Sequence, residues 1–255
     1  MTAPRSRGRT SARRSTAIAE AARPARRRLV YFFDLDDTLH DAATASMPQL
    51  HDSMNAYIRS ELGLDADAAT ALRRRYWHWY GATLLGLVRH HGVKPAHFLH
   101  VTHALPGLED RVRGHAHDLS ALARLPGRKF ILTNAPAAYA ARVLGHLGML
   151  SLFDGVLAIE DMHVFGKLRP KPDARMLRQL CARLGVPPTR CVLVEDTLVH
   201  LKSARRLGMG TVWMQRWLPP ATASHLGPHP AKARRTRRRP AYVDRRVRAL
   251  KALLT

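Results

Sequence analysis

The chain has 255 residues, of which 46% are hydrophobic and 24% charged, so it can bury the core of one large domain or of a domain with an insertion. Its formal net charge of +23 lies mostly at the two ends: residues 1–28 carry nine arginines and one acid, and residues 219–255 carry ten basic residues and one acid. The 190 residues between them hold the remaining +6, so the overall charge does not indicate a nucleic-acid-binding body.

The signals for targeting and for cysteine chemistry are weak. No uncharged apolar stretch approaches the roughly 18 residues that span a bilayer, so no membrane segment is expected. Cys181 and Cys191 lack CxxC spacing, which indicates neither a disulfide framework nor a zinc site. We therefore expect a reducing, cytoplasmic location. Residues 1–28 are predicted to be a disordered basic extension, although their Arg, Ser and Ala content also resembles an organelle transit peptide.

Short apolar runs predict the strands of a parallel sheet. In chain order they are residues 29–33, 129–133, 155–159 (a weaker run), 191–195 and 211–214. Segments of helical length separate them, and three end in a Leu-Gly pair whose glycine suits a left-handed helix end, at Gly148, Gly185 and Gly208. This alternation predicts a doubly wound, Rossmann-like α/β core formed by residues 29–43 and 119–218.

Residues 44–118 interrupt this alternation and predict a helical insertion. Apolar residues recur at helical spacing from Met47 to Leu62, and residues 69–92 form a second helical stretch. That stretch holds three aromatic residues close together: Tyr76, Trp77 and Trp79. Because the insertion follows the first strand, we expect a small helical cap over the carboxyl ends of the strands, where open α/β folds bind ligands.

Residues 219–255 are predicted to be a basic C-terminal tail. Within it, Val243, Val247, Leu250 and Leu254 fall at i, i+4, i+7 and i+11. This spacing predicts an amphipathic helix over 243–254 that could dock on the core or on a partner. The run "RRTRRR" at 234–239 would attract nucleic-acid phosphates without sequence preference.

Polar residues follow three of the predicted strands. They are Asp34 and Asp36 after the first, Thr133 and Asn134 at the second, and Glu195 and Asp196 at the fourth. Because the carboxyl ends of parallel strands meet at one edge of a sheet, these side chains should converge. A hard divalent cation is the simplest compensation for acids held together, so a Mg²⁺ site is predicted. Asp37 is interpreted as a solvated loop acid.

Four motifs occur in the order typical of the haloacid dehalogenase superfamily, which the chain resembles. They are "DLDDT" at 34, "LTNA" at 132, "RPKPD" at 169 and "VEDT" at 194. The resemblance covers essentially all of residues 29–218. It implies a Rossmann-like core with a small helical cap and Mg²⁺-dependent chemistry.

The resemblance implies roles for the matched acids and for one lysine. Asp34 would be the nucleophile and a metal ligand. Asp36 would be the general acid and base, and its backbone carbonyl would also reach the metal. Lys171, which its "PKP" context favours over Lys167, would neutralise charge on Asp34 and on the phosphoryl group.

Other matched residues would complete the site. Thr133 and Asn134 would donate hydrogen bonds to phosphoryl oxygens, and Asp196 would complete the metal site. Three residues would support these groups: Thr38, Glu195 and His200. His200 departs from the family pattern, because many relatives carry Asp or Asn there.

Asp36, the second acid of the motif, indicates the type of reaction. Longer stretches of sequence similarity indicate the substrate. A dehalogenase would not need Asp36, and a transport ATPase would need membrane spans, which leaves hydrolysis of a small-molecule phosphomonoester. Stretches such as "DLDDTLHDA" and "YGATLLGLVRHHG" resemble bacterial pyrimidine 5′-nucleotidases, which implies UMP- or CMP-type substrates. The aromatic residues Tyr76, Trp77 and Trp79 could stack on the base or simply pack the cap.

Two alternatives remain open. The first is a phosphoglycolate- or sugar-phosphate-type hydrolase of the same superfamily. The second, more distant one is a nucleic-acid-binding protein that uses its basic ends.

Overall fold

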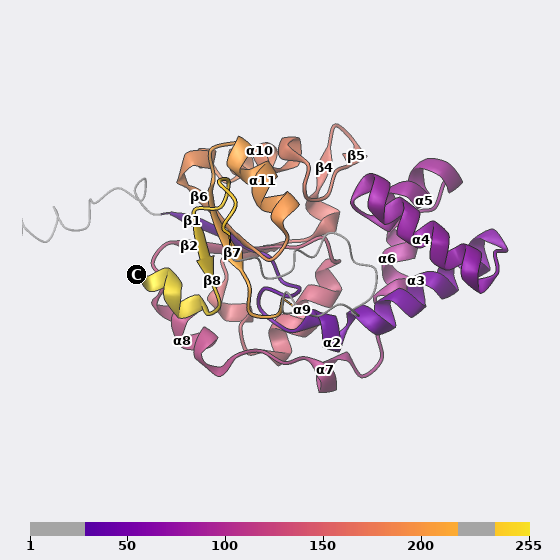
Figure 1. The fold of residues 1–255 in the computed structure, drawn as a ribbon, viewed down its shortest axis with the longest axis horizontal. Coiled ribbons are helices and arrows are strands. Elements are labelled where there is room, and N and C mark those ends of the chain that lie inside the picture. Colours follow the sequence, from indigo (N-terminus) through magenta and orange to yellow (C-terminus); the bar gives the residue numbers. More distant parts are fainter. Residues whose placement is uncertain (1–28, 219–237) are drawn as a thin grey trace, which may run out of the picture.

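The computed structural model describes residues 29–218 and 238–255 (Figure 1). The predicted N-terminal extension and most of the "RRTRRR" run lie outside the described residues. Every helix in the described part falls short of the length and apolar character that crossing a membrane requires.

A parallel sheet forms the centre of the α/β core. In the described residues it has six strands, in the order β3-β2-β1-β6-β7-β8. Their bounds are β1 Val30–Phe33, β2 Arg128–Leu132, β3 Gly155–Leu157, β6 Cys191–Glu195, β7 Gly210–Met214 and β8 Arg245–Val247. Phe33 of β1 pairs with Ile131 on one side and with Val194 on the other, so three strands end level with one another. The predicted doubly wound core is confirmed, and all five apolar runs contain strands.

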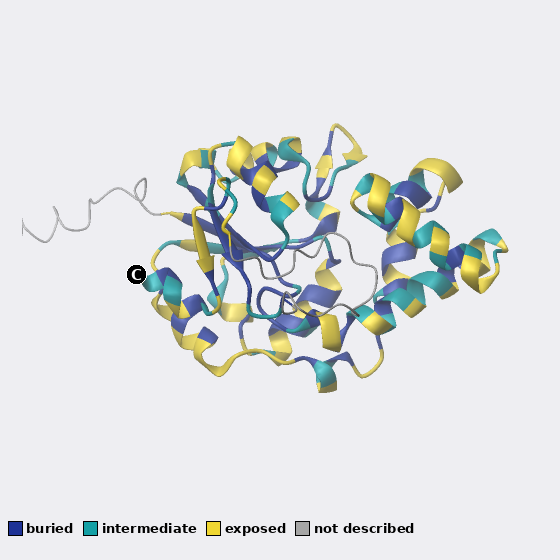
Figure 2. Cartoon of the chain, viewed as in Figure 1, coloured by how far each residue is buried: buried dark blue, intermediate teal, exposed yellow. Residues whose placement is uncertain are grey.

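Helices cover both faces of the sheet. The helices α8 Ala116–Arg124 and α9 Ala137–His146 lie on one face, and α10 Ala174–Arg183 and α11 Leu198–Arg206 lie on the other (Figure 1). Successive strand residues point to opposite faces. Phe33 therefore packs with α8 and α9, whereas Phe32 packs with α10 and α11. Figure 2 shows the central strands buried and the outer helix faces exposed, which explains why these strands read as continuous apolar runs.

The helix ends of the core follow the predicted pattern. Gly148, Gly185 and Gly208 have φ values of 65°, 65° and 81°. Glycine reaches this left-handed region without the steric penalty of a Cβ atom. The left-handed residue ends each helix just before its connection to the next element.

The insertion is helical, as predicted. Within the predicted bounds 44–118 lie α3 Met47–Leu62, α4 Ala66–Tyr80, α5 Thr83–His91, α6 Pro95–Thr102 and α7 Leu108–Arg111. The short helix α2 Ala42–Ala45 begins before residue 44, in the segment predicted as core. The second predicted helical stretch is divided at Gly81, which has a φ of 76°. The cap has its own hydrophobic core around Tyr57 and Leu87, whereas Leu108 and Val112 pack in the core beside the sheet.

Two short antiparallel strands, β4 His163–Val164 and β5 Lys167–Leu168, form a hairpin before α10. Short 3₁₀ helices occur at Leu150–Leu152, Ile159–Asp161, Pro188–Arg190 and Leu250–Leu254. The sequence analysis did not predict these elements.

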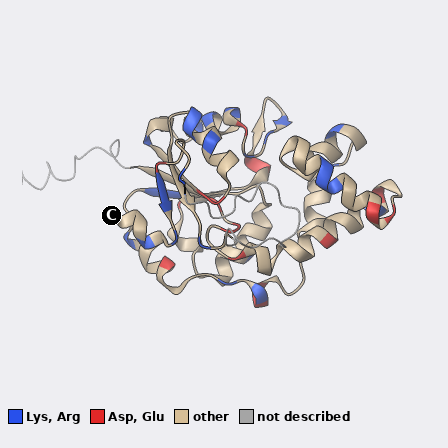
Figure 3. Cartoon of the chain, in the orientation of Figure 1, with Lys and Arg blue, Asp and Glu red and all other residues tan. Residues whose placement is uncertain are grey.

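The predicted helix over 243–254 is wrong. Arg245–Val247 forms β8 beside β7, and a 3₁₀ helix follows. The edge of β7 offers backbone groups that a strand can pair and a helix cannot. Three of the four predicted apolar residues, Val243, Val247 and Leu250, are buried, whereas Leu254 is partly buried and its neighbour Leu253 is buried instead. Figure 3 shows basic residues on β8 and on the outer helices α10 and α11, so part of the predicted basic tail belongs to the sheet.

Replacing Val247 by alanine should lower the free energy of unfolding by about 2 kcal/mol, because two buried methyl groups are lost and a cavity remains. Urea denaturation followed by circular dichroism measures this change. The matched control is Val101→Ala in α6, where the side chain is 42% exposed; there we expect a change within about 0.5 kcal/mol. Equal effects of the two substitutions would contradict the docking of the C-terminal segment.

Candidate active site

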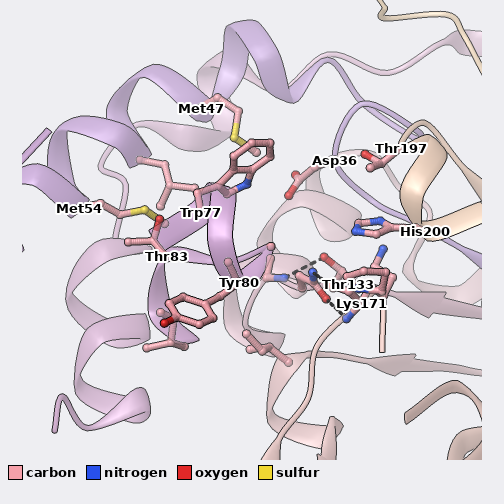
Figure 4. A pocket seen from close by; sticks show the side chains of 18 of the residues that line it. Asp36, Met47, Met54, Trp77, Tyr80, Thr83, Thr133, Lys171, Thr197 and His200 are labelled. Atoms are coloured by element: carbon pink, nitrogen blue, oxygen red, sulfur yellow. Dashed lines mark hydrogen bonds between the residues drawn. The ribbon is translucent and has the colours of Figure 1, made fainter. Parts of the chain in front are cut away.

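The carboxyl ends of β1, β2 and β6 bring the predicted polar residues together. Asp34, Thr133, Glu195 and Asp196 are all less than 10% exposed at this edge. The cause is the shared register of the three strands, which ends each of them at the same level. Figure 4 shows this side of the cavity with Asp36, Thr133, Lys171, Thr197 and His200.

Lys171 lies between two of the acids. Its Nζ donates to Asp34 Oδ1 at 2.6 Å and to Glu195 Oε2 at 2.9 Å, and its side chain is 2% exposed. Burial alone would lower the pKa of this ammonium, but the charges of Asp34 and Glu195 outweigh it and hold the pKa above its usual value. Lys167 is exposed on β5, so the structure places Lys171, the favoured candidate, in the site.

Asn134 fixes the position of Lys171. Its side-chain Nδ2 donates to the Lys171 carbonyl at 3.0 Å, and its Oδ1 accepts from the Lys171 N–H at 2.9 Å. The predicted role of Asn134 was a contact with phosphoryl oxygens. The structure adds a second role, because Asn134 also positions the Lys171 backbone. The sequence does not indicate this contact, since it shows only that Asn134 follows Thr133.

Asp34, Glu195 and Asp196 form a cluster that fits a metal ion, with one ligand oxygen from each within 4.8 Å of the others. Asp196 Oδ2 is buried and has no hydrogen-bond partner among the described residues. Such an orphaned oxygen is what a cation would satisfy. Asp34 and Asp196 were predicted here. Glu195, predicted as a supporting residue, belongs to the cluster itself.

The charges in this cluster are unbalanced. Burial and the nearby charge of Glu195 raise the pKa of Asp34 to about 8 despite the opposing effect of Lys171. Burial, together with the charges of Glu195 and Asp34, raises the pKa of Asp196 well above its usual range. Three buried carboxylates thus share one buried ammonium, and a divalent cation would balance the remaining charge.

Asp36 has different neighbours from Asp34. Its Oδ1 accepts a hydrogen bond from the Tyr139 hydroxyl at 2.8 Å and lies 2.9 Å from His40 Nε2. The side chain is 21% exposed, so it reaches the cavity. The sequence analysis predicted a catalytic role for Asp36 but missed its two partners: Tyr139, which is 103 positions away in the chain, and His40, which is four residues after Asp36.

The remaining predicted residues lie around this site. Thr133 Oγ1 accepts from the Ala135 N–H at 3.0 Å, and His200 Nδ1 is 3.0 Å from Glu195 Oε2. Thr38 is fully buried, and its Oγ1 has no partner among the described residues. Asp37 is not a solvated acid: it is 1% exposed, and its Oδ1 accepts from the Ala43 N–H at the start of α2.

The cap closes the other side of a cavity of about 670 Å³. Figure 4 shows Met47, Met54, Trp77, Tyr80 and Thr83 on this side. Of the three predicted aromatic residues, Trp77 and Trp79 line the cavity. Tyr76 is buried in the cap core with its hydroxyl 2.8 Å from His91 Nε2, so for Tyr76 the packing alternative holds.

Replacing Asp196 by asparagine separates the metal-binding role of this residue from a role in folding. In metal-free protein at pH 7, the free energy of unfolding should stay within about 0.5 kcal/mol or rise, because the raised pKa of Asp196 makes folding take up a proton, and asparagine removes that cost. Wild-type protein with Mg²⁺ at about 100 times the dissociation constant should gain about 2.7 kcal/mol, and the variant should lose most of this gain.

Thermal unfolding with EDTA or with Mg²⁺ provides the measurement. Asp52→Asn is the control, because Asp52 is exposed on α3, and this variant should respond to Mg²⁺ as the wild type does. An unchanged response to Mg²⁺ in Asp196→Asn would contradict the assignment of the metal site.

Comparison with known proteins places this geometry in a family. A model of haloacid dehalogenase-like hydrolases matches residues 29–208. The chain is 26% identical over 200 residues to Phosphate metabolism protein 8 of Saccharomyces cerevisiae, covering 74% of this chain and 61% of that protein. It is 41% identical over 81 residues to Fructose-1-phosphate phosphatase YqaB of Escherichia coli, covering 31% and 40%. The chain therefore matches less than two thirds of the length of either relative.

A similar fold occurs in the crystal structure of a HAD phosphatase from Thermococcus onnurineus. The TM-score is 0.53 at 22% identity, and the match covers 88% of this chain and 95% of the other. The family match extends from β1 to the end of α11 and includes all four sequence motifs. The chain belongs to the haloacid dehalogenase-like hydrolases.

Proposed function

We propose that the chain is a Mg²⁺-dependent phosphomonoester hydrolase that acts through an aspartyl-phosphate on Asp34. One observation carries this proposal: two carboxylates that are two residues apart have separate environments. Asp34 contacts the Lys171 ammonium, whereas Asp36 contacts Tyr139 and His40. Such a separation suits two different roles, a nucleophile and a general acid and base.

In the first step, an oxygen of Asp34 attacks phosphorus, and the bond from phosphorus to the ester oxygen breaks. Lys171 donates to Oδ1 of Asp34, so Oδ2 is the oxygen that would attack. Lys171 and the hydroxyl of Thr133 would stabilise the negative charge on the phosphoryl oxygens, and Asn134 would contribute both by contact and by holding Lys171.

Asp36 would supply the proton that the leaving oxygen needs. It would then take a proton from the water that attacks the aspartyl-phosphate and releases Asp34. A halide leaving group would need no such proton, which favours phosphoryl transfer over dehalogenation within this family.

Mg²⁺ fits the acidic cluster. Asp34 and Asp196 would hold it, together with the backbone carbonyl of Asp36, and Glu195 would lie beside it or bind through water. When bound, Mg²⁺ would neutralise charge on the phosphoryl oxygens. His200, which lines the cavity, and the buried Thr38 would support these ligands.

We propose a pyrimidine nucleoside monophosphate as the substrate. This proposal rests on the sequence stretches that resemble pyrimidine 5′-nucleotidases and on the cap side of the cavity, where Trp77 lies with Met47 and Met54. A flat indole among thioether side chains can stack on a base. A sugar phosphate is the alternative, and the similarity to fructose-1-phosphate phosphatase favours it.

A substrate panel tests the proposal. With Mg²⁺, purified protein should release phosphate faster from UMP, CMP and dUMP than from AMP, GMP, phosphoglycolate or fructose 1-phosphate. Asp34→Asn or EDTA should reduce turnover by at least about 1,000-fold, because both remove the route through the covalent intermediate. Faster turnover of fructose 1-phosphate would show that the substrate is a sugar phosphate and not a nucleotide. No turnover, with salt-sensitive DNA or RNA binding, would favour the nucleic-acid-binding alternative.

Replacing Trp77 by alanine tests recognition of the base. We expect the KM for UMP to rise about tenfold, since stacking of one base on an aromatic side chain contributes about 1–3 kcal/mol. The KM for fructose 1-phosphate should change less than about twofold. Arg75→Ala is the comparison, because Arg75 is exposed on the same helix and is not among the residues that line the cavity. Similar increases in KM for both substrates would contradict stacking by Trp77.

A further inference from the structure

Tyr139 of α9 contacts Asp36 and both connections between the core and the cap. Its hydroxyl lies 2.8 Å from Asp36 Oδ1 and 2.8 Å from Ser46 Oγ, the residue just before α3. Its ring forms a T-shaped contact with the ring of His103, the residue just after α6, with ring centroids 5.9 Å apart. One core side chain therefore contacts the chain where it enters the cap and where it leaves it.

The hydrogen bonds around Tyr139 have a defined direction. Burial and the charge of Asp36 raise the pKa of the Tyr139 hydroxyl well above its usual value, so this group remains a donor. Its hydrogen faces both Asp36 Oδ1 and Ser46 Oγ, and the Ser46 hydroxyl itself donates to the Ala42 carbonyl at 3.3 Å. Because Tyr139 is 2% exposed, water does not compete readily for these contacts.

His40 contacts the same oxygen of Asp36. Its Nε2 lies 2.9 Å from Oδ1, and its ring is fully buried. Nδ1 of this ring has no hydrogen-bond partner among the described residues, so the tautomer with hydrogen on Nε2 satisfies the structure better. Two donors on Oδ1 fix the plane of the carboxylate and thereby the direction of Oδ2.

We propose that Tyr139 is a positioning residue that orients the Asp36 carboxylate for proton transfer and couples this orientation to the seating of the cap through Ser46 and His103. The inference rests on the proposed function. It extends that function, because it makes protonation of the leaving group depend on a residue that does not line the cavity and reaches the site only through the Asp36 side chain. A purely structural Tyr139 would fill space between α9 and the cap and would affect all substrates equally.

The test compares two leaving groups in the full-length Tyr139→Phe variant with Mg²⁺. UMP has an alkoxide leaving group that needs a proton, whereas p-nitrophenolate leaves with little help. The value of kcat/KM reports only the steps through the first phosphoryl transfer. It should fall about tenfold for UMP, consistent with losing a hydrogen bond to a charged group. For p-nitrophenyl phosphate it should change less than about twofold.

Two further variants complete the test. Tyr57→Phe is the matched control, because Tyr57 is 5% exposed in the cap and its hydroxyl lies 3.0 Å from His97 Nδ1; it should leave the ratio of the two kcat/KM values unchanged. Ser46→Ala keeps the Tyr139 hydroxyl and removes its contact to the cap connection. It should shift the ratio in the same direction as Tyr139→Phe, by about twofold to threefold.

The outcomes separate this inference from the proposed function. If the wild type hydrolyses these esters and Tyr139→Phe slows both substrates equally, the positioning role is wrong and the proposed function stands. An unchanged ratio in Ser46→Ala overturns the coupling to the cap, and this result remains decisive if Tyr139→Phe does not fold. If the wild type hydrolyses neither ester, the proposed function fails and the inference fails with it.

Discussion

The site depends on the ammonium of Lys171. It lies 2.6 Å from Asp34 and 2.9 Å from Glu195, and all three groups are largely shielded from solvent. Without this cation, two carboxylates from neighbouring strands would face each other where lost hydration and mutual repulsion both oppose folding. Asn134 holds the lysine by its backbone N–H and carbonyl, so the end of β2 determines where the charge sits.

One ammonium does not balance three buried carboxylates. The pKa values of Asp34 and Asp196 are raised because the carboxyl groups outnumber the ammonium. Oδ2 of Asp196 is a buried carboxyl oxygen of this cluster that has no hydrogen-bond partner among the described residues. A fully balanced cluster would stabilise the fold but would leave nothing to attract a cation. The excess charge is thus a local loss of stability that makes metal binding favourable, a compromise common at functional sites.

Asp34 directly precedes a tight turn that contains Asp36. After β1 ends at Phe33, the Leu39 N–H donates to the Leu35 carbonyl, which turns the chain back on itself. The two acids therefore meet different elements: Asp34 meets Lys171, whereas Asp36 meets Tyr139 of α9. The cap begins directly after this turn, so the geometry of the site and the attachment of the cap are built on the same short segment.

The sequence by itself determined the elements of the core and the identity of the acids. Strands buried on both faces must be continuously apolar, and the motif residues follow those strands directly, so both are visible in local patterns. The sequence did not determine β8 or the contact between Tyr139 and Asp36. The residues 243–254 satisfy a helical spacing equally well, and only the open edge of β7 selects a strand. Tyr139 lies 103 positions from Asp36. Tertiary structure decided these features, because backbone pairing at a sheet edge and hydrogen bonds between distant side chains exist only once the chain has folded.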